Sequence, residues 1–314
     1  MGKVDASAWM NALLYFLARC LVLLFQLLPV RVAFHLGRIV GWLAWKTLKR
    51  RRIVVRKNLE IVNDWLKSEG RASDEMPPLD EQVREVFLRS GANLLAGFTF
   101  TRMAPEKVEA CLEFEGAEVL LEALAEGRGA IILLAHMGPW EALTQLPVFA
   151  RKHGIEAPFG AMYRPLNNTL LDEWFKRERE LKGTRLFGRK SGYHAATDFV
   201  RMGGLLGILS DQRASAGELV TFFGQKAVAT PLPGLLGLRT KAPLVSLSFS
   251  TIGPAQWRIL VSKVEIDSGS DKIDRSTLAQ GIAHAMEELL ASSPADGFWF
   301  HNRFRLPRKY QNDN

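Results

Sequence analysis

The sequence has few cysteines and no motif typical of a metal site. Its 314 residues include two cysteines, Cys20 and Cys111, and no Cys-x-x-Cys pair. The six histidines are scattered, and Cys/His or carboxylate clusters at ligand spacing are absent. We therefore expect no disulfide framework, no metal ion and no cofactor, and we infer a reducing compartment.

Two further kinds of motif are missing. Gly-x-Ser-x-Gly, which presents a nucleophilic serine in many hydrolases, does not occur. No base-reading motif or aromatic–basic platform accompanies the formal net charge of +8. A nucleic-acid partner is therefore not expected, and the charge suits an anionic lipid surface or an acidic protein or substrate.

The beginning of the chain is strongly apolar. Residues 6–18 and 20–30 are free of charge, and only Arg19 separates them. A spanning helix needs roughly 20 apolar residues, so a single span or a monotopic hairpin is expected. A helical hairpin buried in a soluble domain is the alternative, and a signal peptide is disfavoured because no small-residue cleavage site follows. The seven Lys and Arg residues between 46 and 57 favour a cytoplasmic, anionic membrane surface.

After residue 126, short apolar runs alternate with segments that have helical spacing. This pattern predicts an α/β fold with a mainly parallel central sheet flanked by helices, preceded by an N-terminal hydrophobic, membrane-associating helical region. We place the domain boundary between 1–62 and 63–314, and we expect a loop over 63–78. Strands are predicted at 130–135, 155–162, 185–187, 205–209, 220–223, 244–250 and 257–266, and helices at 79–98, 116–126, 139–152, 166–181, 193–202 and 273–292.

His136 and Glu141 form the principal candidate site. His136 follows a predicted buried strand, and Glu141 falls in the first turn of the next helix. Ligand chemistry in open α/β sheets gathers at the carboxyl ends of strands. A histidine there accepts a proton near neutral pH, and a carboxylate on its other ring nitrogen fixes the tautomer. Because no protein nucleophile accompanies the pair, this base would activate a hydroxyl of the substrate; a loop histidine beside a helix-capping glutamate is the alternative.

Further segments occur in a fixed order around this pair. They are Arg56–Leu59, Met162–Asn168, Ser210–Gln212, Val220–Gly224, Ala229–Ala242 and Phe298–Arg303. Together with His136–Glu141 they resemble the blocks of the bacterial lipid A biosynthesis (lauroyl/myristoyl) acyltransferases, within the lysophospholipid acyltransferase superfamily. The segment Gln212–Gly217 departs from the commonest form of its block, and phenylalanine stands among the terminal aromatics where tryptophan is frequent.

The resemblance implies a reaction and a set of site residues. A fatty acyl chain would pass from a thioester, on acyl carrier protein or on coenzyme A, to a hydroxyl of a lipid A precursor without an acyl-enzyme. His136 would be the general base and Glu141 would hold it. Arg164 would bind a phosphate, and Asp211 would support His136 or orient Arg164. Gln212 and Thr230 are further candidates for substrate binding.

The resemblance also implies a place in the cell. We expect the bacterial inner membrane, with 63–314 as the acyltransferase domain on the cytoplasmic side. Two alternatives stay open: transfer to another membrane lipid, such as a lyso-glycerolipid, an aminolipid or a phosphoinositol mannoside, and a non-catalytic membrane-anchored binding protein. His301 and Arg303 either close the pocket or pack beside Trp299, and packing is favoured. A candidate docking patch for acidic carrier protein comprises Arg185, Arg189 and Lys190.

Overall fold

The computed structural model describes residues 6–188, 192–214, 216–266 and 274–311, and the structural statements below refer to these residues. Two members of the candidate docking patch, Arg189 and Lys190, lie outside them. The third, Arg185, is exposed at the start of a strand.

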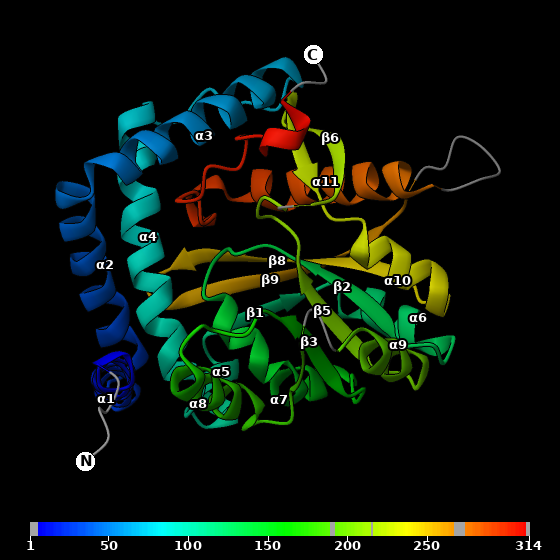
Figure 1. The fold of residues 1–314 in the computed structure, drawn as a ribbon, viewed down its shortest axis with the longest axis horizontal. Helices are drawn as coiled ribbons and strands as arrows, with labels where there is room; N and C mark the ends of the chain where they lie inside the picture. The colour runs from blue at the N-terminus through cyan, green and yellow to red at the C-terminus, as the bar shows by residue number, and fades with distance from the viewer. Residues whose placement is uncertain (1–5, 189–191, 215, 267–273, 312–314) are drawn as a thin grey trace.

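The first four helices cover one side and the top of the molecule in the view of Figure 1, with the third of them running across the top. They are α1 (Ala6–Gln26), α2 (Val30–Thr47), α3 (Lys49–Ser68) and α4 (Leu79–Phe100). The backbones of α2 and α4 touch, because a Cβ atom on Gly41 would lie 2.2 Å from the Phe87 carbonyl oxygen and one on Gly91 would lie 2.2 Å from the Gly37 oxygen. Glycine is therefore required for this close packing.

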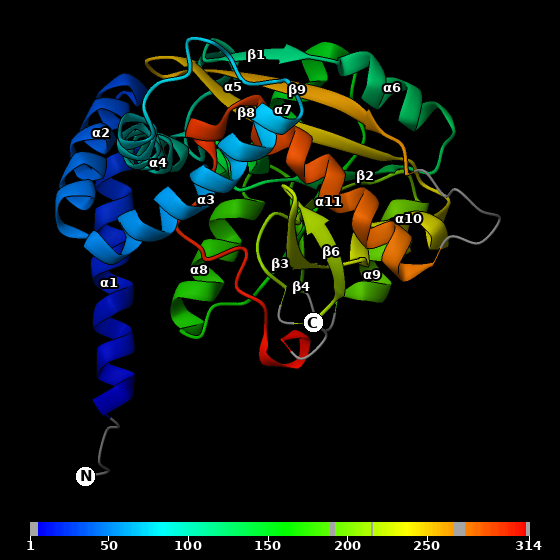
Figure 2. The ribbon, with the colours of Figure 1, turned by 90° about the horizontal axis from the view of Figure 1, so that it is seen from above.

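Helix α1 projects from the body of the molecule (Figure 2). Its segment Ala8–Gln26 is the one helix in the described part of the chain that is long and apolar enough to cross a membrane, and 6% of its most apolar window is buried. Trp9 and Phe16 on this helix are 68% and 62% exposed. By its length and its exposed apolar surface, this helix could associate with a membrane.

The loop predicted over 63–78 is wrong for its first part, because α3 continues to Ser68. Val55, Leu59, Val62 and Leu66 are all buried along one face of α3. Their spacing of three to four residues keeps the helix packed against the protein beyond residue 62. The division of the chain at residue 62 stays a prediction.

The central sheet has seven strands in the order β1-β9-β8-β2-β5-β3-β4. They are β1 (Leu112–Glu115), β2 (Ala130–Leu134), β3 (Phe159–Tyr163), β4 (Arg185–Gly188), β5 (Leu205–Leu209), β8 (Leu244–Gly253) and β9 (Gln256–Val264). All neighbours are parallel except the β8–β9 hairpin. The predicted fold class is therefore confirmed. A separate hairpin joins β6 (Glu218–Phe222) and β7 (Gln225–Ala229).

Helices lie on both sides of this sheet (Figure 2). They include α5 (Pro105–Glu109), α6 (Ala117–Ala125), α8 (Thr169–Glu180), α9 (Tyr193–Arg201), α10 (Leu232–Thr240) and α11 (Arg275–Ser292). The single helix predicted over 139–152 is wrong: the segment is divided into a 3-10 turn, η1 (Trp140–Gln145), then α7 (Leu146–Phe149) and a second turn, η2 (Ala150–His153). Pro147 accounts for the break, because it has no N–H to donate into a longer helix.

Strand β2 lies between β5 and β8 and is buried along its whole length. Burial on both faces explains why its sequence is a continuous apolar run rather than an alternating one. The residues that follow β2 consequently emerge from the most enclosed part of the sheet, at the edge where the parallel strands end.

Candidate active site

His136 and Asp211 meet at the carboxyl ends of two neighbouring strands. Leu134 of β2 is paired with Leu209 of β5, and each polar residue follows two positions later. The Nδ1 atom of His136 lies 2.7 Å from Oδ1 of Asp211. The parallel register therefore brings together two side chains that are 75 residues apart in the sequence.

The two groups stabilise each other's charged forms. Burial alone would lower the pKa of His136, but attraction to Asp211 and the hydrogen bond with it outweigh burial, and the pKa is raised. Glu141 raises it further, and Arg179 opposes the rise. Burial would raise the pKa of Asp211, but His136 and backbone hydrogen bonds lower it. Asp211 is 7% exposed. Its carboxylate stays ionised in this buried position because it is paired with His136.

Glu141 is not the carboxylate that holds the His136 ring, so this part of the prediction is corrected. Its two oxygens accept hydrogen bonds from Arg179 on α8, at 3.0 Å from Nε and 2.8 Å from Nη2. This geometry is a bidentate ion pair, which fixes both side chains. Glu141 lies close enough to influence the His136 pKa, while the partner of Nδ1 is Asp211.

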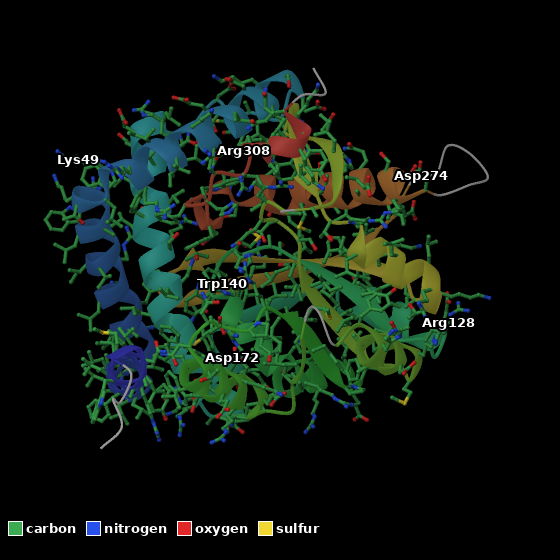
Figure 3. All side chains as sticks on the ribbon, in the orientation of Figure 1. Lys49, Arg128, Trp140, Asp172, Asp274 and Arg308 are labelled. Carbon is green, nitrogen blue, oxygen red and sulfur yellow. The ribbon has the colours of Figure 1, made fainter. Side chains whose placement is uncertain are left out.

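Two aromatic rings lie beside His136. The ring centroid of Trp140 lies 5.4 Å away and that of Phe298 lies 6.5 Å away. These two rings also contact each other edge to face, with centroids 5.5 Å apart. Figure 3 labels Trp140 near the middle of the view, at the start of η1, which packs against α4. The apolar wall limits water around the imidazole and suits a hydrocarbon substrate.

The backbone of the histidine loop is fixed by a C-terminal strap, residues 294–303. The Phe298 N–H donates to the His136 carbonyl oxygen at 2.8 Å, and the Gly138 N–H donates to the Asp296 carbonyl oxygen at 3.2 Å. Gly138 has φ +56°, and a Cβ atom there would lie 2.4 Å from the Phe249 carbonyl oxygen. Glycine is therefore needed for the tight turn after His136.

Asp296 anchors the strap to the helices. Its carboxylate is fully buried and accepts hydrogen bonds from Arg89 at 2.9 Å and Asn93 at 3.0 Å, both on α4. It also accepts from the N–H and the hydroxyl of Thr251 at the end of β8. A satisfied network of this kind holds the strap, and through it the His136 loop, at a fixed position.

The other predicted site residues occupy different surroundings. The Gln212 amide lies 3.4 Å from Nδ1 of His136. Arg164 follows β3 at the same sheet edge, is exposed, and has no hydrogen-bond partner among the described residues. The Thr230 hydroxyl accepts from the Leu232 N–H at the start of α10. Substrate binding by these residues stays a prediction.

Two residues important to this geometry were not identified from the sequence. Arg179 and Asp296 lie 38 and 207 residues from the side chains Glu141 and Arg89 that they pair with. A lone arginine on an amphipathic helix carries no local signal for such a role. Among the described residues, no group of three or more His, Cys, Asp or Glu side chains is placed to hold a metal ion.

Comparison with known proteins identifies the family of the chain. The model of the bacterial lipid A biosynthesis acyltransferase family matches residues 5–306. The chain belongs to this family. The lipid A biosynthesis lauroyltransferase of Escherichia coli strain K12 is 23% identical over 297 residues, covering 90% of each protein. The palmitoleoyltransferase of the same strain is 22% identical over 280 residues, 88% of this chain and 86% of the relative.

A third relative, the lipid A biosynthesis acyltransferase of Haemophilus influenzae, is 26% identical over 68% of this chain and 63% of its own length. The predicted family is thus confirmed, and the protein is an acyltransferase. As an acyltransferase of this family it acts with an acyl donor and a lipid acceptor.

Proposed function

We propose that the protein transfers a fatty acyl chain from an acyl carrier protein thioester to a hydroxyl of a lipid A precursor, with His136 as the general base. The observation that carries the proposal is the hydrogen bond between Nδ1 of His136 and Asp211. With Nδ1 occupied, Nε2 is the ring nitrogen left for the substrate, and it has no hydrogen-bond partner among the described residues. Asp211 holds the ring and stabilises the imidazolium that forms.

In the proposed reaction the acceptor oxygen attacks the thioester carbonyl carbon while Nε2 of His136 takes the hydroxyl proton. The tetrahedral intermediate then breaks its carbon–sulfur bond, and the departing thiolate receives the proton from the imidazolium. The products are an ester and a free thiol. We propose that no acyl-enzyme forms, and this is supported by Ser210, the serine next to Asp211, which is 4% exposed and donates its hydroxyl to the Ile208 carbonyl oxygen.

Two arginines supply positive charge near this reaction. Arg179 lies within electrostatic reach of His136, since its charge opposes the rise in the histidine pKa. Its Nε and Nη2 groups are bonded to Glu141, so we assign to its remaining Nη1 group the stabilisation of negative charge that develops on the carbonyl oxygen. Arg164 is exposed at the end of β3 and is free to make a bidentate contact with a phosphate of the acceptor.

The N-terminal helices support a location at the inner membrane. The apolar surface of α1 would insert into the bilayer, and the seven basic residues from Lys46 to Lys57 would face anionic headgroups. A Lys/Arg-rich flank favours the cytoplasmic side. There the catalytic domain would meet carrier protein from the cytoplasm and lipid acceptor from the membrane.

The test uses the full chain in detergent micelles or nanodiscs. Carrier-protein and coenzyme A thioesters of several chain lengths are offered with a panel of lipid acceptors, and products are identified by mass spectrometry. We expect an ester of a lipid A precursor formed from the carrier-protein thioester, and its loss in His136→Ala. His194→Ala, which changes an exposed histidine on α9, is the control. A full rate in His136→Ala overturns the mechanism, and product only with other lipids overturns the acceptor.

A further inference from the structure

Asp211 also lines a small cavity beside the histidine. The cavity offers about 10 Å³ for the centre of a water molecule, which is the space that one bound water needs. Its lining comprises Asp211, Gln212, Leu290, Phe298, Trp299, His301 and Arg303. Several of these side chains are polar, so the cavity is suited to water and not to a hydrocarbon chain.

Arg303 is the most unusual group in this lining. It is 4% exposed, its Nη1 donates to the Val228 carbonyl oxygen at 2.9 Å, and its guanidinium lies 4.5 Å from the centroid of the Phe222 ring. Its Nε is buried without a hydrogen-bond partner among the described residues. Burial lowers the pKa of Arg303 to about 10, and attraction to Asp211 opposes this shift. A buried N–H of a charged group is costly unless it has an acceptor.

His301 places a second unpaired atom at the same cavity. Its Nδ1 is buried and has no partner within the described ranges. Burial lowers the pKa of His301, and the positive charges of Arg213, Arg303 and Arg51 lower it further against the effect of Asp211. The ring is therefore neutral near pH 7, where Nδ1 can donate or accept one hydrogen bond according to its tautomer.

The segment that carries both residues is held on several sides. The Asn58 side-chain amide on α3 donates to the carbonyl oxygens of Trp299 and His301, each at 2.9 Å. The strap also bonds to the His136 carbonyl through the Phe298 N–H. Arg303 and His301 are consequently presented to the cavity by a fixed backbone, as a preorganised polar site requires.

We propose that Arg303 and His301 hold one water molecule against Asp211, and that Arg303 is thereby a positioning residue for His136. The water accepts from Nε of Arg303 and donates to the Asp211 carboxylate, with His301 Nδ1 as its third partner. Asp211 is then fixed from two directions, by the water and by the histidine. This proposal rests on the proposed role of His136 as base.

The charged groups that face the two central residues define the expected effect. The charged groups facing His136 are Asp211, Glu141 and Arg179. Asp211 faces His136 on one side, and Arg303 and His301 on the side of the cavity. Removing Arg303 frees the Asp211 carboxylate to rotate and loosens its bond to Nδ1. Arg303 is not among the charges acting directly on His136, so the loosened contact with Asp211 dominates. The pKa of His136 then falls, and the acid limb of the rate profile moves to lower pH by about half a unit to one unit.

The experiment compares the full-length wild type with Arg303→Met and His301→Gln. Acyl transfer is measured from pH 5 to 9, and the imidazole of His136 is titrated by NMR with ¹⁵N-labelled histidine. Arg308→Gln, which removes an exposed arginine from the 3-10 turn η4 (Arg308–Tyr310), is the charge-matched control. We expect Arg303→Met to lower the pKa of His136 and to move the acid limb of the rate profile to lower pH. His301→Gln should shift both by less, and Arg308→Gln should leave both unchanged.

A double-mutant comparison separates positioning from general destabilisation. If Arg303 acts through Asp211, Arg303→Met adds no further shift in an Asp211→Asn background. An unchanged His136 titration in both cavity variants, or a shift that adds fully to that of Asp211→Asn, overturns the proposal. If Arg303→Met does not fold, the His301→Gln titration decides alone. A normal rate in His136→Ala instead overturns the proposed function, while the NMR titration still tests the positioning.

Discussion

Replacing Asp211 by asparagine distinguishes the roles of the two acids that lie near His136, the proposed general base. The amide has nearly the shape of the carboxylate, so the side chain still fits its buried position at 7% exposure. Its amide oxygen can still accept a hydrogen bond from Nδ1 of His136, which lies 2.7 Å from Oδ1 of Asp211 in the wild type. What is lost is the negative charge, and with it the attraction that raises the pKa of His136.

The size of the effect follows from this contact. An opposite charge at such a distance shifts a pKa by about 1–3 units, so the acid limb of the rate profile of Asp211→Asn should move to lower pH by about that amount. A base with no carboxylate to stabilise its imidazolium transfers protons less well, and we expect kcat to fall roughly 10²- to 10⁴-fold.

Stability should respond in a defined pH window. The raised pKa of His136 contributes stability that is complete below the ordinary histidine value and is lost as pH rises through the folded-state pKa. The lowered pKa of Asp211 contributes above the ordinary aspartate value and is lost as pH falls through its own folded-state pKa. Asp211→Asn should therefore reduce the free energy of unfolding most between about pH 4 and 6.5.

Initial rates of ester formation and denaturant unfolding, each measured from pH 4 to 9 where the protein is soluble, give the comparison. Glu141→Gln is the matched variant: it breaks the ion pair with Arg179 and should shift the acid limb less than Asp211→Asn. Two results would refute the conclusion that Asp211 holds the His136 ring. One is a larger shift of the acid limb in Glu141→Gln than in Asp211→Asn, and the other is a wild-type rate with an unshifted acid limb in Asp211→Asn.

Three further outcomes test the scaffold. Gly41→Ala places a methyl group 2.2 Å from the Phe87 carbonyl oxygen, and should lower the free energy of unfolding by roughly 1–3 kcal/mol in denaturant titrations. Asp296→Ala leaves Arg89 with Glu85 as its remaining ion-pair partner. It also leaves the Asn93 amide and the Thr251 N–H without this acceptor, and should cost about 3–5 kcal/mol in the same measurement. Leu17→Lys on the exposed face of α1 should weaken co-sedimentation with anionic vesicles, because lysine costs about 2.5–3.5 kcal/mol at the centre of a spanning helix; unchanged sedimentation would contradict insertion of α1.

The buried strands were predictable because burial leaves a direct mark on the sequence. Strand β5 matches its predicted bounds, 205–209, and β2 differs by one residue at its end. Strand β1 was missed because its four residues, Leu-Glu-Phe-Glu, alternate in burial and are too few to be distinguished from a turn. Strand β7 was missed because it begins with exposed Gln225 and Lys226. Strand β1 is fixed by β9, far away in the sequence, which a local pattern does not record. Strand β7 is fixed by the neighbouring strand β6 in a hairpin.

The candidate site was also predictable only in part. The sequence places His136 and Asp211 directly after two buried strands, and strand adjacency in the sheet then determines that they meet. Spacing within one segment favoured Glu141 because it is five residues away, but η1 directs that carboxylate to Arg179 on α8. Which of two acids reaches a histidine depends on strand order and on the competing cation, and neither is encoded in the spacing.

In the proposed mechanism, Asp211 sets the charge balance around His136, because Glu141 offsets the charge of Arg179. While the ring is neutral, Asp211, Glu141 and Arg179 leave one excess negative charge facing it. When Nε2 takes the acceptor proton, the imidazolium cancels that charge in a site where burial makes uncompensated charge costly. The Glu141–Arg179 pair adds little net charge itself, so the excess comes from Asp211. The arrangement therefore stabilises His136 more after proton transfer than before it, which is the differential stabilisation that a general base requires.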